Sequence, residues 1–261
     1  MIRRDLPAEG SEPARWAIIG QIDHARLSGR LAEHWGAGGF APLVPRDALL
    51  WAIEHHDDGW RAWDAAPGVD PERGRPRSFT EMEVPDAVAI WVKSIEAAAT
   101  AGPLEAALVA GHFCALQRRA TSFHQDDPAW AHAEAFLAEY EAKIDRWLAD
   151  WQAADPVANT PAVAERALRQ LQFFDLLSLW FCCSRATEPE VLQTPSGQEL
   201  TLTPLDSQRV GLSPWPLEVG SLAVEVPARA VRVRHYESRE DLATAASEPL
   251  VLRWELVPRR G

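Results

Sequence analysis

Residues 49–60 have the sequence LLWAIEHHDDGW, in which an apolar segment runs directly into two histidines and two aspartates. We expect a helix at residues 46–57, because Pro45 precedes it, Gly59 follows it and its centre is apolar on every side. Ionisable side chains are rarely fully buried without a partner. The cluster at the end of this buried helix therefore indicates a compensating charge, and a metal ion is the simplest one.

Further helices are expected on both sides of this segment. A strand at residues 15–20 should lead into a helix at residues 22–35, which ends at a group of glycines. The remaining helices are predicted at residues 86–100, 103–119, 128–153 and 161–185. The last of them is hydrophobic on every face except at Asp175, which is a second charge in apolar surroundings. The Pro- and Gly-containing segment 60–83 is either a lid or binding loop, or a plain insertion.

Beyond residue 185 the sequence alternates between apolar and polar residues, which is typical of strands with one buried face. These segments are residues 199–203, 221–226, 230–234 and 250–256. The sequence thus predicts a mainly α fold, a helical core with a small C-terminal antiparallel β-sheet, α+β overall. Residues 1–187 would form the helical metal-binding domain, and residues 188–261 a sheet appendage packed on it.

Composition narrows the class of protein. The formal net charge is −12, which argues against nucleic acid or an anionic membrane as the main partner. A small anionic substrate stays compatible, because a bound cation reverses the local field. Cys114, Cys182 and Cys183 form no CxxC pair, so neither a disulfide framework nor a thiolate zinc site is expected. The first residues lack the apolar stretch of a signal peptide, and we expect a cytoplasmic protein.

Adjacent helical residues such as His56 and Asp57 diverge by about 100° around the helix axis, so an ion that binds both must lie in the groove between them. Further ligands must come from neighbouring helices, where His24 and Asp175 are candidates. Imidazole and carboxylate ligands suit zinc, manganese or iron, and four of them leave positions open for water. The alternatives are an exposed helix end at His56, a hydrogen-bonded core His24, and a buried ion pair between Asp175 and an arginine.

The order of these residues resembles that of the HD-domain metal phosphohydrolases, whose helical core carries an early His, a His-Asp pair that ends a buried helix, and a late Asp. The resemblance covers residues 18–185. The metal ligands that it implies are His24, His56, Asp57 and Asp175, with His112 as the first and His132 or His124 as the second candidate for a further ion. Trp60 stands where many members have a lysine, so that lysine's substrate contact is not carried over.

The chain is also similar to an uncharacterised bacterial family, the domain-of-unknown-function family 3891. The segments that carry this similarity are QIDH at residues 21–24, HHDDGW at residues 55–60 and LQFFDLLSL at residues 171–179. The similarity covers almost the whole chain but implies no particular activity.

The HD-domain resemblance implies hydrolysis of a small phosphorylated molecule by water that one or two metal ions activate. Asp58 is the candidate for proton transfer, and Lys93, Arg118 and Arg119 are the candidates for binding the substrate anion. Two alternatives stay open: a di-iron oxygenase, as in the related myo-inositol oxygenase, and a non-catalytic binding module that a metal stabilises. An uncovered edge of the predicted sheet would also allow a homodimer.

Overall fold

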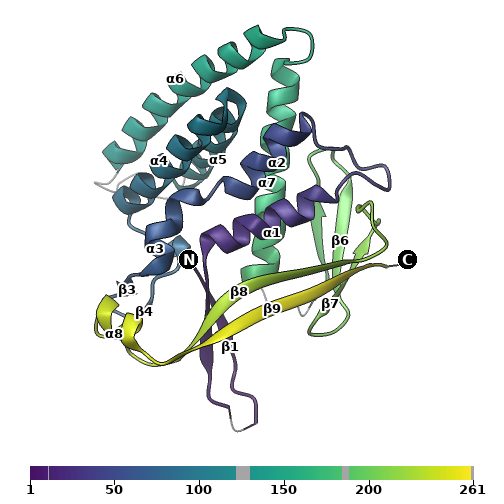
Figure 1. Ribbon diagram of the computed structural model, residues 1–261. Helices are drawn as coiled ribbons and strands as arrows, with labels where there is room; N and C mark the ends of the chain where they lie inside the picture. The colour runs from purple at the N-terminus through teal and green to yellow at the C-terminus, as the bar shows by residue number, and fades with distance from the viewer. Residues whose placement is uncertain (11, 122–129, 184–187, 260–261) are drawn as a thin grey trace.

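The computed structural model describes residues 1–10, 12–121, 130–183 and 188–259. In this part of the chain, helices gather at one end and a curled sheet lies at the other (Figure 1). The helices are α1 (Gln21–Glu33), α2 (Arg46–His55), α3 (Arg61–Ala65), α4 (Val84–Ala101), α5 (Pro103–Thr121), α6 (Trp130–Ala154), α7 (Pro161–Cys183) and α8 (Arg239–Thr244). Two 3₁₀ turns, η1 (Asp58–Trp60) and η2 (Phe79–Glu81), lie between α2 and α4.

The six predicted helices are confirmed as α1, α2 and α4 to α7, each within a few residues of its expected ends. Helices α4, α5 and α6 pack on one another, whereas α1 and α7 pack side by side and each also contacts the sheet. Helix α1 contacts β8, and α7 contacts β1. These two helices are therefore shared between the helical and the sheet parts of the molecule (Figure 1).

The main sheet has seven strands in the order β1-β2-β8-β9-β7-β6-β5. Neighbouring strands are antiparallel, except that β7 and β9 run parallel. Its strands are β1 (Ile2–Leu6), β2 (Arg15–Ile19), β5 (Glu190–Gln193), β6 (Glu199–Pro204), β7 (Arg209–Ser213), β8 (Leu222–Arg232) and β9 (Ser247–Pro258). A second, two-stranded sheet pairs β3 (Val69–Asp70) with β4 (Arg75–Pro76).

The prediction of a small C-terminal sheet is wrong. The sheet is large and takes β1 and β2 from the first twenty residues of the chain. Strand β2 was expected, but it pairs with β8, so that Ala17 lies opposite Ala230, and local alternation cannot reveal so distant a partner. The two segments predicted at residues 221–226 and 230–234 form one strand, β8, with Pro227 inside it.

The division at residue 187 stays a prediction, and the sheet draws strands from both sides of it. Strands β1 and β5 form the two edges of the sheet. The homodimer also stays a prediction, and these edges are where strand pairing with a second copy would occur.

The segment between α2 and α4 is ordered by short elements. It contains η1, α3, the β3–β4 pair and η2, and a capping box between Ser78 and Glu81 begins η2. Arg3 of β1 donates to both carboxylate oxygens of Glu81, at 2.8 and 3.0 Å, so this segment is tied to the edge strand.

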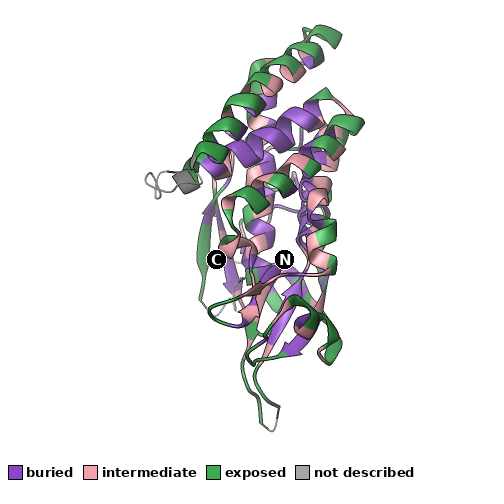
Figure 2. Ribbon diagram, turned by 90° about the vertical axis from the view of Figure 1, so that its left-hand side faces the viewer, coloured by how far each residue is buried: buried purple, intermediate pink, exposed green. Residues whose placement is uncertain are grey.

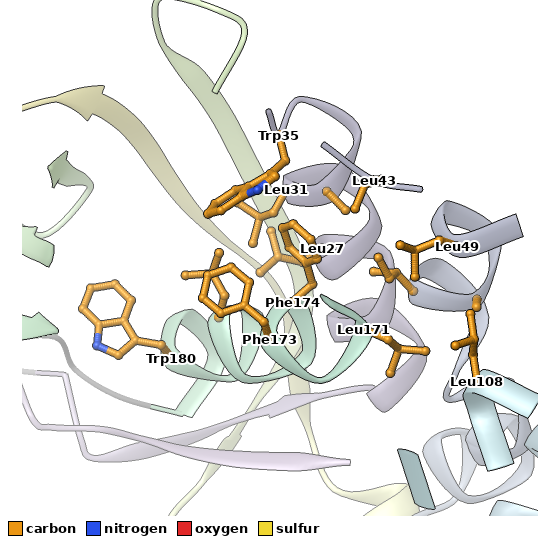
Figure 3. Close-up of a cluster of buried hydrophobic side chains, with 14 of the residues drawn as sticks. Leu27, Leu31, Trp35, Leu43, Leu49, Leu108, Leu171, Phe173, Phe174 and Trp180 are labelled. Carbon is orange, nitrogen blue, oxygen red and sulfur yellow. The ribbon is translucent and has the colours of Figure 1, made fainter. Parts of the chain in front are cut away.

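The main hydrophobic core runs from the sheet through α1 and α7 to the other long helices, and Figure 2 shows buried residues on the inward faces of these elements. Trp35, which follows α1, packs edge-on against Phe173 and Phe174 of α7 with ring centroids 5.2 Å apart (Figure 3). Leu27 and Leu31 of α1 and Leu171 of α7 belong to the same buried cluster. Among the helices in the described ranges, none is both long enough and apolar enough to cross a membrane.

The position of β1 in the sheet can be tested with Ile2→Ala. Ile2 is 1% exposed and belongs to the main core, so its truncation should lower the free energy of unfolding by about 2–5 kcal/mol. The measurement is urea unfolding followed by circular dichroism. Val157→Ala is the matched control, because Val157 is 89% exposed and should change stability by less than about 0.5 kcal/mol. Equal effects of the two variants would contradict the assignment of β1 to the folded sheet.

Candidate metal centre

His24 comes to the site on the buried face of α1. Its helix begins after Gly20, and the residues at helical spacing around His24, among them Gln21, Ser28 and Leu31, are buried as well. The imidazole is fully buried at 0% exposure. Because the helix turns its polar histidine into the core, both ring nitrogens need partners there.

His56 and Asp57 lie where α2 ends. Helix α2 stops at His55, His56 still has helical backbone angles, and Asp57 leaves them with φ −108° and ψ 18°. Gly59 then passes tightly against α4: its N–H donates to Ser94 Oγ at 2.9 Å, and a Cβ at this position would collide with the carbonyl of Ile90. This close approach explains the glycine, which allows the chain to turn with both side chains facing inward.

Asp175 of α7 completes the convergence. One ligand atom each from His24, His56 and Asp175 lies within 4.8 Å of the other two, and this buried group could hold a metal ion. Asp175 Oδ1 is 3.4 Å from Nε2 of both histidines. Asp57 Oδ2 is 3.2 Å from His24 Nε2 and 3.6 Å from His56 Nε2, so a second carboxylate reaches the same two nitrogens.

His112 of α5 lies beside this group. Its ring centroid is 5.3 Å from that of His56, and its Nε2 is 3.9 Å from Asp175 Oδ2. Burial lowers the pKa of His112 to about 4, despite the nearby Asp175 charge. The imidazole is therefore neutral near pH 7, which is the form that binds metal ions.

Hydrogen bonds orient the imidazoles. His56 Nδ1 lies 2.8 Å from the carbonyl oxygen of Ile53 and must donate to it, so its Nε2 faces the carboxylates. His24 Nδ1 lies 2.6 Å from Ser178 Oγ, and Ser28 Oγ donates to the same hydroxyl at 2.8 Å. If Nδ1 of His24 is the donor, its Nε2 is left with a lone pair directed at Asp57 and Asp175.

The donor set fits a divalent transition metal. Within the described part of the chain, His56 Nε2 is buried without a hydrogen-bond partner, which is unusual for a buried nitrogen. Two aspartates and two or three imidazoles, without thiolate, match the ligands of zinc, manganese or iron.

Without a metal, the charges in this cluster compensate one another. Burial alone would lower the pKa of His56, but Asp57 and Asp175 raise it to about 9. Burial would likewise raise the pKa of both aspartates, yet the surrounding imidazoles hold each below its usual value. A protonated His56 therefore offsets one of the two aspartate charges.

A cleft of about 470 Å³ opens beside the cluster. His112 and Asp175 line it, whereas the side chains of His24, His56 and Asp57 are at most 5% exposed. Asp175 is 13% exposed on its side chain, so the cluster reaches the cleft through α5 and α7. Small-molecule sites in proteins are commonly of this size.

The other predicted site residues lie apart from the cluster in the contacts described. Asp58 Oδ2 is hydrogen-bonded to His55 Nδ1 at 3.0 Å, and Asp58 Oδ1 lies 3.6 Å from the guanidinium of Arg61. His132 on α6 and Lys93 on α4 are exposed, and Arg118 pairs with Glu141. Arg119 lines the cleft, and His124 falls outside the described residues. The roles of these residues stay predictions.

Sequence reasoning missed three residues near the centre: Ser28, Arg169 and Ser178. Ser28 follows His24 by four positions and Ser178 follows Asp175 by three, so each lies on the same helix face as a predicted ligand. That spacing could have identified them. Arg169 lines the cleft, but its i,i+4 pair with Glu165 is the pattern of an ordinary helix surface.

The charge state of His56 gives a pH dependence in the metal-free protein. Its pKa is raised from 6.5 to about 9 in the folded state, so its contribution to stability is complete below 6.5 and is lost as the pH rises to about 9. Chelator-treated protein should therefore lose unfolding free energy across this interval in urea titrations. His56→Gln should flatten this dependence, whereas the exposed His132→Gln should retain it; equal slopes in all three proteins would refute the assignment.

Comparison with known proteins gives a family but no activity. None of the curated proteins and none of the solved structures matches the chain significantly. The family model described as a protein of unknown function, DUF3891, matches residues 9–233, which include every residue of the cluster and of the cleft. The chain therefore belongs to the DUF3891 family of proteins of unknown function.

Proposed function

We propose that this protein is a metal-dependent hydrolase of a small phosphorylated molecule. The observation that carries the proposal is the position of the His24, His56 and Asp175 cluster beside a cleft of about 470 Å³. Arginine side chains line the same cleft as the cluster. Asp175 and His112, as candidate metal ligands, and Arg119 and Arg169, as candidate anion-binding groups, line this one cavity, and this supports the proposal.

In this proposal His24, His56, Asp57 and Asp175 hold the ion, and His112 serves a second ion if there is one. A bound divalent ion would lower the pKa of water and polarise a phosphoryl oxygen. The burial of His24, His56 and Asp57 keeps bulk water from one side of the centre. Substrate must therefore approach along Asp175 and His112, which line the cleft.

Ser28 of α1 and Ser178 of α7 form a hydrogen-bonded pair beside the metal ligand candidate His24. Ser178 Oγ donates to the carbonyl oxygen of Asp175 at 2.9 Å, and Ser28 and His24 converge on the same hydroxyl. If this hydroxyl accepts a hydrogen bond from His24 Nδ1–H, it selects the tautomer whose Nε2 can bind a cation. We infer that Ser178 is a positioning residue for the metal ligand His24.

The order of the ligands supports the proposal by analogy. An early His, a His-Asp pair that ends a buried helix and a late Asp is the pattern of the HD-domain phosphohydrolases, and here these residues lie on α1, at the end of α2 and on α7. Analogy of this kind raises the expectation of hydrolysis without naming the substrate. The identity of the bound metal, and whether it reacts with oxygen, distinguish the proposed hydrolase from the di-iron oxygenase alternative.

Metal content and turnover test the function together. Untagged protein should contain about one or two equivalents of a transition metal by elemental analysis, and should hydrolyse p-nitrophenyl phosphate. Asp57→Asn and Asp175→Asn each remove a carboxylate charge and should lose most of the metal and at least about 100-fold in turnover. Asp150→Asn is the matched control, because Asp150 is exposed on α6.

Two results would overturn the proposal. Native protein that is free of metal and takes up none when it is added would reduce the cluster to a buried ion network. Metal-loaded protein that hydrolyses no phosphate monoester, but shows an iron-dependent optical signal and reacts with oxygen, would favour the oxygenase.

Ser178→Ala tests the positioning of His24. The variant should bind metal about 10–100-fold more weakly, because the ligand loses the hydroxyl that orients it. Isothermal titration calorimetry with Mn²⁺ or Zn²⁺ measures the affinity, and near-ultraviolet circular dichroism checks that the fold is kept. Ser221→Ala, at an exposed serine, should bind like the native protein; undiminished affinity in Ser178→Ala would contradict the role.

A further inference from the structure

The cleft beside the cluster is built from two helical stripes. His112, Leu116 and Arg119 follow one another at helical spacing along α5, and Arg169, Gln172, Leu176 and Leu179 do so along α7. The turn between β5 and β6, from Thr194 to Gly197, forms a further wall. The sheet thus contributes directly to the cavity that the metal centre faces.

Two arginines line the cleft of this acidic protein. The chain carries a net charge of −12, yet Arg119, Arg169 and Asp175 are the charged side chains among the described residues that line the cleft. Arg169 donates to Glu165 through one nitrogen, and a guanidinium has further N–H groups for a second acceptor. Two guanidinium groups in the same cleft as a candidate metal ligand favour an anionic ligand.

The polar groups of the β5–β6 turn are engaged within the hairpin. Thr194 Oγ1 accepts from the N–H of Gln198 at 3.1 Å, and Gln193 Nε2 donates to Glu199 at 3.1 Å. Gln198 also donates to the carbonyl oxygen of Gly39 at 3.2 Å, which ties the turn to the segment after α1. These bonds hold the wall in place and engage Thr194 Oγ1 and Gln193 Nε2 within the hairpin.

Apolar side chains also line the cleft that the arginines line. Leu116 and Leu179 are half-buried, and the buried Phe173 also lines the cleft. Leu176 lies one residue from Asp175 and is 51% exposed, although leucine is usually buried. An exposed leucine inside a cleft, beside arginines and a candidate metal ligand, suits a ligand with an apolar part.

We infer that the substrate is a phosphate monoester with an apolar, aromatic or branched aliphatic body, rather than a polyhydroxylated one. Its phosphate faces Asp175 and the metal centre together with Arg119 and Arg169, and its body lies on Leu176 and Leu179. This inference rests on the proposed function for the position of the phosphate. It adds the chemical class of the group that the phosphate is attached to.

The test compares two phosphonates, which cannot be hydrolysed, on Mn²⁺-loaded protein by isothermal titration calorimetry. Phenylphosphonate should bind at least about 10-fold more tightly than methylphosphonate, because only the former covers the leucines. Leu176→Ser should lower this ratio at least about 3-fold, and Arg169→Gln should weaken both ligands. Val157→Ser, at a valine that is 89% exposed outside the cleft, is the matched control and should keep the native ratio.

Hydrolysis of phenyl phosphate and glycerol 2-phosphate, measured in parallel by phosphate release, separates the two proposals. Suppose that both esters are hydrolysed in a metal-dependent reaction, but the two phosphonates bind with equal affinity or Leu176→Ser leaves their affinity ratio unchanged. This result would overturn the apolar-body inference and leave the proposed function standing. A phenyl preference that depends on Leu176, without hydrolysis of either ester, would support the ligand class and count against the hydrolase. No detectable binding of either phosphonate at millimolar concentration would overturn the inference.

Discussion

The arrangement of α1, α2 and α7 depends on how the negative charges of two buried carboxylates are compensated. Asp57 and Asp175 come from opposite parts of the chain, and each lies within 3.6 Å of imidazole nitrogens on other elements. A carboxylate in apolar surroundings is costly unless a positive charge or hydrogen bonds accompany it. The end of α2 must therefore keep its position beside α1 and α7. The close packing of Gly59 against α4 fixes that end.

Helices α1 and α7 connect the cluster to the rest of the molecule. The face that carries His24 also carries Leu27 and Leu31, and the turn that carries Asp175 also carries Phe174. Because apolar packing and ligand placement use the same helix faces, core contacts hold the ligand atoms in place. The sheet packs on the same two helices, and its β5–β6 turn walls the cleft.

The residues of the cluster could be predicted from the sequence more completely than the sheet could. His56, Asp57 and Asp175 interrupt segments that are otherwise apolar, so each is visible within its own neighbourhood. The sheet is different, since β2 is recognisable by itself but its partner β8 lies more than two hundred residues away. Strand β1, with the sequence IRRDL, carries too many charges to be recognised as part of a sheet, and only pairing with β2 makes it a strand. Arg169 shows the same limit, because only the fold turns its surface-like helix face into the wall of a cleft.

Stability alone does not explain why this buried cluster is ionic. Replacing a buried ion network with apolar side chains of similar volume is often neutral or stabilising, so charge pairing alone gives little reason to place two aspartates and three histidines in a core. A proton on His56 offsets one of the two aspartate charges in the metal-free protein, whereas a divalent cation would supply two positive charges while requiring unprotonated imidazoles. Proton and cation would then compete for one group of ligands. Such a competition needs ligand atoms that are held in place before the ion binds. The Nε2 atom of His56, which is buried without a hydrogen-bond partner among the described residues, fits that requirement.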